Sequence, residues 1–169
     1  MKRLSYMLIA ITGVLAFASC EKKDVAAGLP ELEHHYYALF VPNTNTGITV
    51  ARTQTTLVKF PIQFYSTFVR DYDAVAKYAV TTYGITTPAV RGVDYNIVDK
   101  NGTVIPSADS SYSIVFPKAI QAMDTIYMKL LNNPATGVRK MEIQLLDNIT
   151  PQFDVDIFST AFRRPVQIN

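Results

Sequence analysis

Residues 55–65, TTLVKFPIQFY, alternate between large apolar side chains and a mixed set with a period of two. The apolar positions are Val58, Phe60, Ile62 and Phe64. Successive side chains of a β-strand point to opposite faces, so this alternation predicts a strand with one buried face. Pro61 lies in the middle of the stretch and has no backbone N–H to donate. It therefore predicts that the strand lies at a sheet edge or bends at this residue.

Similar short stretches, rich in β-branched and aromatic residues, continue on both sides of this segment. Further strands are predicted at residues 35–41, 48–52, 78–83, 94–98, 112–116, 125–131, 138–146, 153–158 and 162–168. Turn-forming residues separate them at 99–102 (DKNG) and at 132–137 (NNPATG), and the second of these predicts a hairpin loop. Many short strands with turns between them predict an all-β fold, a sandwich of two antiparallel sheets.

The first twenty residues, MKRLSYMLIAITGVLAFASC, differ in character from the rest of the chain. A positive start, a short apolar run and small residues before a cleavage point are the layout of a secretory signal peptide. The small residues lead into Cys20, the single cysteine, and this ending resembles the lipobox of bacterial lipoproteins, with Phe17 where leucine is usual. The resemblance implies cleavage after residue 19 and acyl chains on Cys20, which would hold the protein on a membrane. The alternatives are a secreted protein with a free thiol and an uncleaved anchor.

Three parts of the chain follow from this: a signal peptide at 1–19, a lipidated N-terminus and linker at 20–33, and a folded domain at 34–169. The charged run Glu21–Asp24 resembles the surface-export signals of Bacteroidota lipoproteins. That resemblance implies an outer-membrane protein that faces outward. The alternative is a solvated tether that keeps the domain away from the bilayer.

Length and charge limit the classes of function. The domain is long enough to bury a hydrophobic core. The chain has 16 basic and 14 acidic residues, and two of the basic ones, Lys2 and Arg3, belong to the signal. The mature chain is therefore nearly neutral, which argues against a nucleic-acid partner, since such partners need a basic face. After the signal no apolar run has the length of a membrane helix, so the lipid is the expected membrane contact.

The residue types needed for catalysis do not gather in a recognisable motif. We predict no catalytic residues, no cofactor and no metal ligands. His34 and His35 are the two histidines of the chain, and as neighbours on a strand they point to opposite faces and make a poor metal pair. A mature chain whose only cysteine is lipidated has no thiolate metal site. Seven glycines without clustering give no phosphate-binding loop.

Two sets of motifs carry a resemblance to a known family. The first is residues 88–95, PAVRGVDY, in which a glycine is followed by Asp-Tyr. The second runs from GTVIP at 102–106 through SYSIVFP and DTIYMKL to MEIQL. This order resembles Calx-beta immunoglobulin-like domains and a group of Bacteroidota surface lipoproteins built on a related sandwich. The resemblance implies an immunoglobulin-like antiparallel β-sandwich, in which Tyr95 fills the core at a strand start and Asp94 hydrogen-bonds the preceding turn.

Some members of that superfamily bind calcium through clustered carboxylates at one end of the domain. The acidic pairs here are Asp71 with Asp73 and Asp154 with Asp156, each spaced to place both acids on one side of a strand. Calcium takes about six to eight oxygen ligands, usually with several carboxylates. Two separate pairs without a larger cluster therefore favour solvated faces over a calcium site.

Thr125 and the tyrosines are the remaining features of interest. The segment Asp124-Thr125-Ile126 resembles the O-glycosylation acceptor of Bacteroidota periplasmic proteins, so Thr125 is a candidate glycosylation site; the alternative is that it only opens a strand. The ten tyrosines have apolar rings with polar tips, which suit sugars and protein partners, and core packing is their alternative role. Tryptophan is absent, which weakens but does not remove the case for glycan binding.

These observations predict a noncatalytic, lipid-anchored binding or accessory lipoprotein. By resemblance, such lipoproteins accompany TonB-dependent transporters in nutrient capture, with a glycan or a peptide as the ligand. The alternative is a structural cell-surface or adhesin-type module without a small-molecule ligand.

Overall fold

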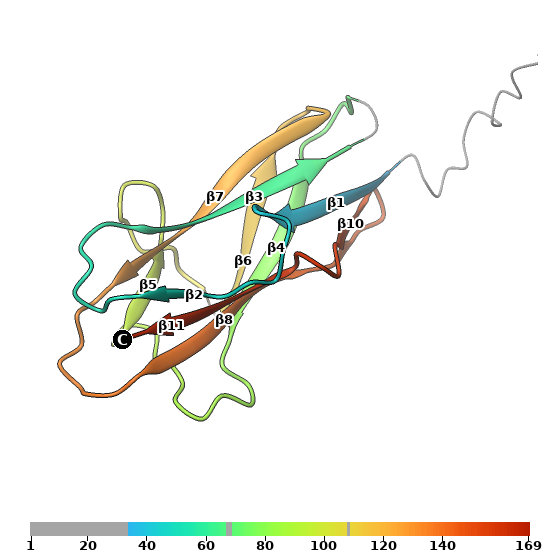
Figure 1. Cartoon of the computed structure of the whole chain (residues 1–169). Coiled ribbons are helices and arrows are strands. Elements are labelled where there is room, and N and C mark those ends of the chain that lie inside the picture. The colour runs from blue at the N-terminus through green and yellow to red at the C-terminus, as the bar shows by residue number, and fades with distance from the viewer. Residues whose placement is uncertain (1–33, 67–68, 108) are drawn as a thin grey trace, which may run out of the picture. The chain divides into compact units, whose positions relative to one another are not determined.

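The computed structural model describes residues 34–66, 69–107 and 109–169 (Figure 1). The predicted signal peptide, Cys20 and the predicted linker lie outside these residues. The described residues form eleven β-strands and no helix, and hence no helix that could cross a membrane. The strands are β1 His35–Phe40, β2 Ile48–Val50, β3 Val58–Tyr65, β4 Ala74–Thr81, β5 Tyr95–Val98, β6 Ser111–Phe116, β7 Gln121–Leu130, β8 Arg139–Leu146, β9 Asn148–Ile149, β10 Asp154–Ile157 and β11 Arg163–Ile168.

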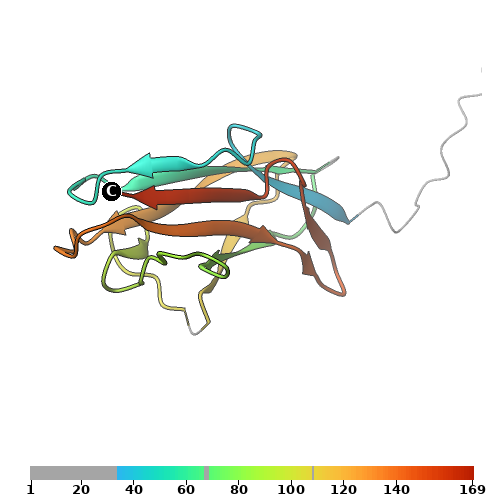
Figure 2. The ribbon, with the colours of Figure 1, turned by 60° about the horizontal axis from the view of Figure 1, so that its bottom comes forward.

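The strands form two sheets that pack face to face (Figures 1 and 2). Sheet A has the strand order β5-β7-β3-β1-β10-β9, and sheet B has the order β2-β11-β8-β4-β6. Most neighbouring strands are antiparallel, whereas β1 with β10 and β2 with β11 are parallel pairs. The all-β sandwich predicted from the alternating patterns is confirmed.

One continuous hydrophobic core lies between the two sheets. Its fully buried large side chains are Tyr36, Phe40, Phe60, Phe64, Phe116, Ile62, Ile97, Met128, Met141, Ile143, Leu145 and Ile168. The ring of Phe64 in sheet A stacks on that of Phe116 in sheet B, with 4.8 Å between their centroids. Burial of one large apolar side chain contributes roughly 1.5–3 kcal/mol, so these inner faces supply most of the stabilisation.

Pro61 lies inside sheet A, and the edge position predicted for its strand is wrong. β3 pairs with β7 on one side and with β1 on the other. The carbonyl of Pro61 accepts a hydrogen bond from the N–H of Val41 at 2.9 Å. The N–H and the C=O of one strand residue point to the same side, so the donor that proline lacks also faces this side. Val41 follows the last residue of β1, where the ladder has already ended, and the sheet therefore tolerates the proline.

The loop at residues 132–137 is a crossover and not the predicted hairpin. It leads from β7 in sheet A to β8 in sheet B. The guanidinium of Arg52 donates hydrogen bonds to the carbonyls of Asn133, Ala135 and Gly137. These contacts fix the path of the chain from one sheet to the other.

The turn before β5 has the arrangement that the family resemblance implies. Tyr95 begins the strand and is 3 % exposed. The buried carboxylate of Asp94 accepts hydrogen bonds from the N–H of Val90 and from the side-chain amide of Asn133, both at 2.7 Å. Gly92 has a φ of 79°, a conformation that glycine adopts without steric cost. The motif is therefore a structural element of the fold.

Candidate ligand-binding surface

Four large side chains are exposed together on the outer face of sheet A. This aromatic patch consists of Tyr37, Tyr65, Met123 and Phe158, which are 42 %, 43 %, 58 % and 41 % exposed. They belong to β1, β3, β7 and the residue after β10, and these four strands are neighbours in the order β7-β3-β1-β10. Exposed apolar side chains that gather on adjacent strands mark an interaction surface, whereas single scattered ones do not.

Strand alternation and register place the rings of the patch side by side. Tyr36 faces the core, so Tyr37 points to the opposite, outer face. Tyr37 lies opposite Tyr65 of β3 on one side and Asp156 of β10 on the other, and Tyr65 lies opposite Gln121 of β7. The result is a row across four strands that begins and ends with a hydrogen-bonding side chain and has two tyrosines between them.

Tyr37 and Phe158 contact each other edge to face. Their ring centroids are 5.7 Å apart, and the ring planes meet at 78°. Such aromatic pairs contribute about 0.5–1.5 kcal/mol beyond the burial of their area. The contact holds both rings in one orientation while leaving part of each to the solvent, so a ligand would meet a surface that is already ordered.

A polar cluster borders the aromatic patch on β1 and β10. The Nε2 atom of His35 lies 3.0 Å from Oδ2 of Asp154, and its Nδ1 atom lies 3.5 Å from Oδ2 of Asp156. The parallel pairing of β1 with β10 produces this cluster, since it places His35 opposite Asp154. The sequence predicted that the two aspartates share one face, and this is confirmed. It gave no signal that a histidine would lie between them.

His34 belongs to a different cluster. Its Nδ1 atom lies 2.8 Å from the hydroxyl of Tyr72, which lies 2.7 Å from the hydroxyl of Tyr36. Burial raises the pKa of Tyr72, and the hydrogen bond with Tyr36 raises it further. The ring of Tyr72 also stacks on Phe153 with 5.5 Å between the centroids. The two neighbouring histidines therefore have separate partners.

The acidic pairs differ in their placement. Asp71 and Asp73 lie in a bend before β4, so the strand predicted for them is wrong. Asp154 and Asp156 lie on one face of β10, where His35 contacts both of them. Within residues 34–66, 69–107 and 109–169, no group of three or more His, Cys, Asp or Glu side chains is placed to hold a metal ion.

Thr125 lies in the middle of β7, opposite Pro61, and is half-buried. The strand begins at Gln121, so Thr125 does not open it as the alternative role required. Its backbone N–H donates to Oδ1 of Asp124 at 2.6 Å. Glycosylation of Thr125 stays a prediction.

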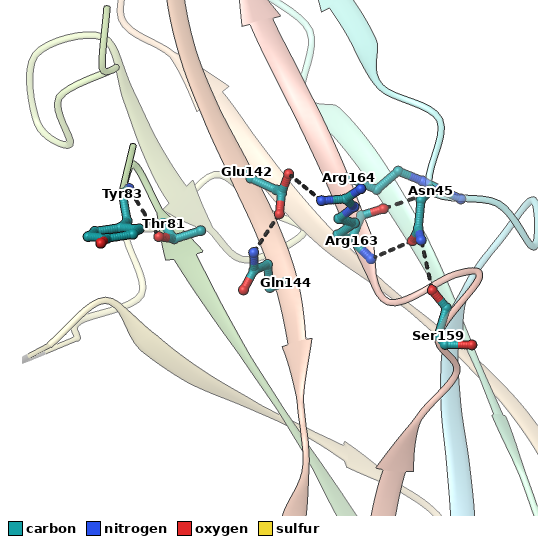
Figure 3. Close-up of polar contacts among 8 residues, drawn as sticks. All are labelled: Asn45, Thr81, Tyr83, Glu142, Gln144, Ser159, Arg163 and Arg164. Atoms are coloured by element: carbon teal, nitrogen blue, oxygen red, sulfur yellow. Dashed lines mark hydrogen bonds and ion pairs between the residues drawn. The ribbon is translucent and has the colours of Figure 1, made fainter. Parts of the chain in front are cut away.

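On the outer face of sheet B, polar side chains of β8 and β11 bond to one another (Figure 3). Glu142 of β8 lies 3.9 Å from the guanidinium of Arg163 in β11 and accepts a hydrogen bond from the amide of Gln144. The backbone N–H of Arg163 donates to Oδ1 of Asn45 at 3.1 Å, and the amide of Asn45 donates to the carbonyl of Ser159 at 2.9 Å. These groups already have partners, so sheet A offers the better surface for a ligand.

The aromatic patch and its neighbours offer groups that are suited to binding. The rings offer flat apolar faces, and the adjacent aspartates offer hydrogen-bond acceptors. The ring nitrogens of His35 contact carboxylates, and no serine or threonine hydroxyl in the described part of the chain is hydrogen-bonded to them. The pairing of nucleophile and base that covalent catalysis uses is therefore not assembled at this surface.

No protein-family model matches this chain, and no curated protein matches its sequence. The Calx CBD2 domain is similar in structure, with a TM-score of 0.52, 9 % identity, and 78 % of this chain and 85 % of that chain covered. The apo-form Calx CBD1 domain gives 0.49 and 12 % identity, covering 79 % of this chain and 97 % of that one. The calcium binding domain CBD12 of CALX1.1 gives 0.46 and 12 %, covering 78 % and 44 %.

A likeness at 9 % identity carries information on the fold alone. Calcium binding is named for CBD12 of CALX1.1, and a similar fold does not transfer it to this chain. The fold that the sequence motifs implied is confirmed: the described residues form an all-β, two-sheet sandwich that resembles the immunoglobulin-like Calx-beta domains.

Proposed function

We propose that the protein is a noncatalytic binding lipoprotein that holds a saccharide against the aromatic patch of sheet A. The observation that carries this proposal is the patch itself, four exposed large side chains on adjacent strands. Sites for small molecules combine apolar and aromatic side chains with a few polar groups that fix the orientation of the ligand. The patch has this composition, because Asp156 and Gln121 lie at the two ends of its row of tyrosines.

A saccharide fits this surface because it has two kinds of group. Its C–H faces pack on aromatic rings, and its hydroxyls donate hydrogen bonds to carboxylate and amide oxygens. Tyr37 and Tyr65 supply the rings, and Asp156 supplies an acceptor next to them. A peptide would use the same rings, and the binding experiment distinguishes the two.

The proposed setting is the outer membrane. A lipid on Cys20 would anchor the domain there, facing outward, as an accessory subunit beside a TonB-dependent transporter in nutrient capture. The lipobox-like end of the signal, the charged run after it and the resemblance to Bacteroidota surface lipoproteins support this setting. An anchored aromatic patch would hold the ligand close to the transporter.

A glycan array followed by titration calorimetry tests the binding proposal. Tyr37→Ala should lower the affinity for the glycan found by at least about tenfold, which corresponds to about 1.4 kcal/mol. The matched control is Tyr83→Ala, since Tyr83 is 97 % exposed in the loop after β4 of sheet B, and it should bind like the parent. Binding of peptides in place of glycans would contradict the saccharide as the ligand. Loss of glycan binding in the Tyr83 variant, with the Tyr37 variant unchanged, would show that the site is not the aromatic patch.

Fractionation of cells tests the anchor. Cys20→Ser removes the thiol that would carry the lipid, so the variant should move from the membrane fraction to the soluble fraction. Detergent-dependent membrane association that stays unchanged in this variant would contradict lipidation.

A structural or adhesin-type module is the second candidate function. It is favoured by β6, which lies at the margin of sheet B, because margin strands can pair with strands of other chains. Pull-down of intact outer-membrane complexes, together with the glycan array, separates the two functions. Stable protein partners without any glycan would favour the structural role.

A further inference from the structure

The edge of sheet B at β6 is open, unlike the other three edges of the sandwich. β2 has three residues and β9 has two, so each exposes little backbone. The edge at β5 is covered, since the N–H of Ile105 donates to the carbonyl of Ile97 at 3.0 Å. β6, in contrast, has six residues, SYSIVF, without the proline or charged side chain that protects many edge strands.

The register of β6 shows which of its backbone groups face outward from the sheet. The N–H of Val80 donates to the carbonyl of Ser110 at 3.1 Å, which begins the hydrogen-bonded ladder between β4 and β6. In an antiparallel pair every second residue bonds to the partner strand, so Tyr112, Ile114 and Phe116 face β4. The N–H and C=O groups of Ser113 and Val115 point the other way.

These two residues are the open part of the edge. The N–H and C=O of Ser111 also point outward, but they bond to the carboxylate of Asp109 and the hydroxyl of Ser107. Within the part of the chain that the structure describes, Ser113 and Val115 make no such bond. Their backbone groups are therefore available to a further strand.

The first half of β7 faces the same space. β5 pairs with β7 only from Tyr127 to Leu130, so among the described residues the side of β7 before Tyr127 has no neighbouring strand. The N–H of Ser66 donates to the carbonyl of Ile120 at 2.8 Å, which fixes the alternation along β3 and β7. By this alternation the backbone groups of Met123 and Thr125 point away from β3, and of these the N–H of Thr125 bonds to the carboxylate of Asp124. The backbone groups of Met123 and the C=O of Thr125 thus border the same space as the edge of β6.

A groove of about 400 Å³ occupies this space between the two sheets. Its lining includes Tyr78, Ser113, Ile114, Asp124 and Tyr127. The carboxylates of Asp99 and Asp124 and the single ammonium of Lys100 also border it, so its charge is negative on balance.

We propose that an extended peptide segment with basic side chains binds in this groove and adds a strand to β6. Strand addition at an open edge uses main-chain hydrogen bonds for affinity and alternate side chains for specificity. Side chains that point inward would meet the apolar surface of Ile114 and the carboxylate of Asp124, and a lysine or arginine complements that carboxylate. A second copy of this chain fits less well, since its β6 carries no basic residue. The inference does not depend on the saccharide proposal, because the residues that line the groove are not those of the aromatic patch.

The test uses the full-length protein in detergent micelles and two acetylated, amidated heptapeptides. One peptide, TKVKVKT, has lysine at alternate positions, and the other, TEVEVET, replaces each lysine with glutamate. We expect the lysine peptide to bind at least about tenfold more tightly. We also expect it to slow hydrogen exchange of the Ser113 and Val115 amides at least about tenfold, since it would bond to them. No change at these two amides, or equal binding of both peptides, would overturn the proposal.

Two pairs of variants locate the binding. Val115→Pro removes an outward-facing N–H at a position where the side chain is 58 % exposed, and edge strands tolerate such prolines. It should lower the affinity for the lysine peptide at least about tenfold, whereas Val115→Thr, which keeps the N–H, should not. Asp124→Asn should reduce the preference for lysine over glutamate, and Asp99→Asn should reduce it less, because the Asp99 carboxylate accepts two backbone N–H groups, from Asn101 and Thr103, whereas that of Asp124 accepts one, from Thr125. Protection of Ser113 and Val115 that rises with protein concentration in the absence of peptide would instead show self-pairing and overturn the proposal.

Discussion

The inner and outer faces of sheet A carry the same kinds of side chain in opposite surroundings. Tyr36 of β1 is fully buried, and its ring lies 5.4 Å from that of Phe64. Tyr37, the next residue, is 42 % exposed and lies opposite another exposed tyrosine, Tyr65. The inner rings stabilise the fold, whereas the outer rings are free to contact a ligand. An abundance of tyrosine therefore indicates neither core nor binding site until the face of each residue is known.

The outer face of sheet B sharpens this contrast. Its Glu142 and Arg163 form an ion pair at 3.9 Å, and ion pairs at a protein surface contribute about 0–1 kcal/mol. Polar side chains of this kind are well hydrated. Apolar rings left in water, as on the outer face of sheet A, are less well hydrated, and they gather where a partner can cover them. The gathering of exposed rings on the outer face of sheet A is the reason to search for the ligand there.

Removal of a ring from the inner face should have the largest effect. Tyr95→Ala deletes a buried ring at the start of β5 and should lower the free energy of unfolding by about 3–5 kcal/mol, a large share of the total for a domain of this size. Thermal denaturation followed by circular dichroism measures this loss, which in the extreme abolishes soluble expression. A Tyr95→Ala protein that melts like the parent would refute the structural role and make this turn a candidate binding surface.

The inner face could be predicted from the sequence because a strand has only two faces. The alternation in residues 55–65 assigns Phe60 and Ile62 to the covered side, and both are buried. The roles of Asp94 and Tyr95 came from the resemblance of their motif to Calx-beta domains, and the structure has the same arrangement. Local patterns therefore give the identity of the buried residues.

The outer face could not be assembled from the sequence, because alternation does not say which strands are neighbours. The aromatic patch and the His35 cluster both depend on the parallel pairing of β1 with β10. These two strands are neighbours in the sheet but lie near opposite ends of the domain's sequence. The turn residues at 132–137 indicate a reversal but not that the chain changes sheets there. The sequence shows that Pro61 has no backbone N–H to donate. Only the pairing in the structure shows that β1 ends beside Pro61, which explains why an inner strand tolerates this proline.

A second way to test the inner face is alkaline pH. Burial raises the pKa of Tyr95 to about 12, whereas a tyrosine in an unfolded chain titrates near 10. Its contribution to stability is complete below about pH 10 and is lost as the pH rises toward about 12, because only the unfolded state releases the proton in this range. The loss is about 1.4 kcal/mol per pH unit.

Urea denaturation at several pH values measures this slope. Tyr95→Phe, which keeps the ring but has no ionisable hydroxyl, should make the slope between about pH 10 and 12 shallower by the same amount. Tyr83→Phe is the control, since that side chain is 97 % exposed. An unchanged slope in the Tyr95 variant would mean that its hydroxyl titrates alike in both states.

Loss of the carboxylate beside Tyr95 should have a smaller effect. In Asp94→Ala the N–H of Val90 and the amide of Asn133 lose their acceptor, which should lower the free energy of unfolding by about 2 kcal/mol. Asp99→Ala is a matched control, because the exposed carboxylate of Asp99 also accepts two hydrogen bonds, both from backbone N–H groups, and its loss should cost less. If both variants lose the same free energy of unfolding, the hydrogen bonds of the buried Asp94 contribute no more than those of the exposed Asp99.

The smallest effect is expected on the outer face. Tyr37→Ala and Phe158→Ala each remove a partly exposed ring, so each should change the free energy of unfolding by no more than about 1 kcal/mol. The two rings touch edge to face, and a double-mutant cycle should therefore give a coupling of about 0.5–1 kcal/mol, no larger than either single loss. The same cycle with Tyr83→Ala in place of Phe158→Ala should give none.

This coupling decides whether the patch is ordered before a ligand arrives. A value within the expected range means that Tyr37 and Phe158 hold each other in place in the free protein, so a ligand does not have to order them. A coupling near zero would mean that the rings move independently and that binding must fix them. A loss from Tyr37→Ala as large as that from Tyr95→Ala would remove the contrast between the two faces, since Tyr37 would then be a core residue.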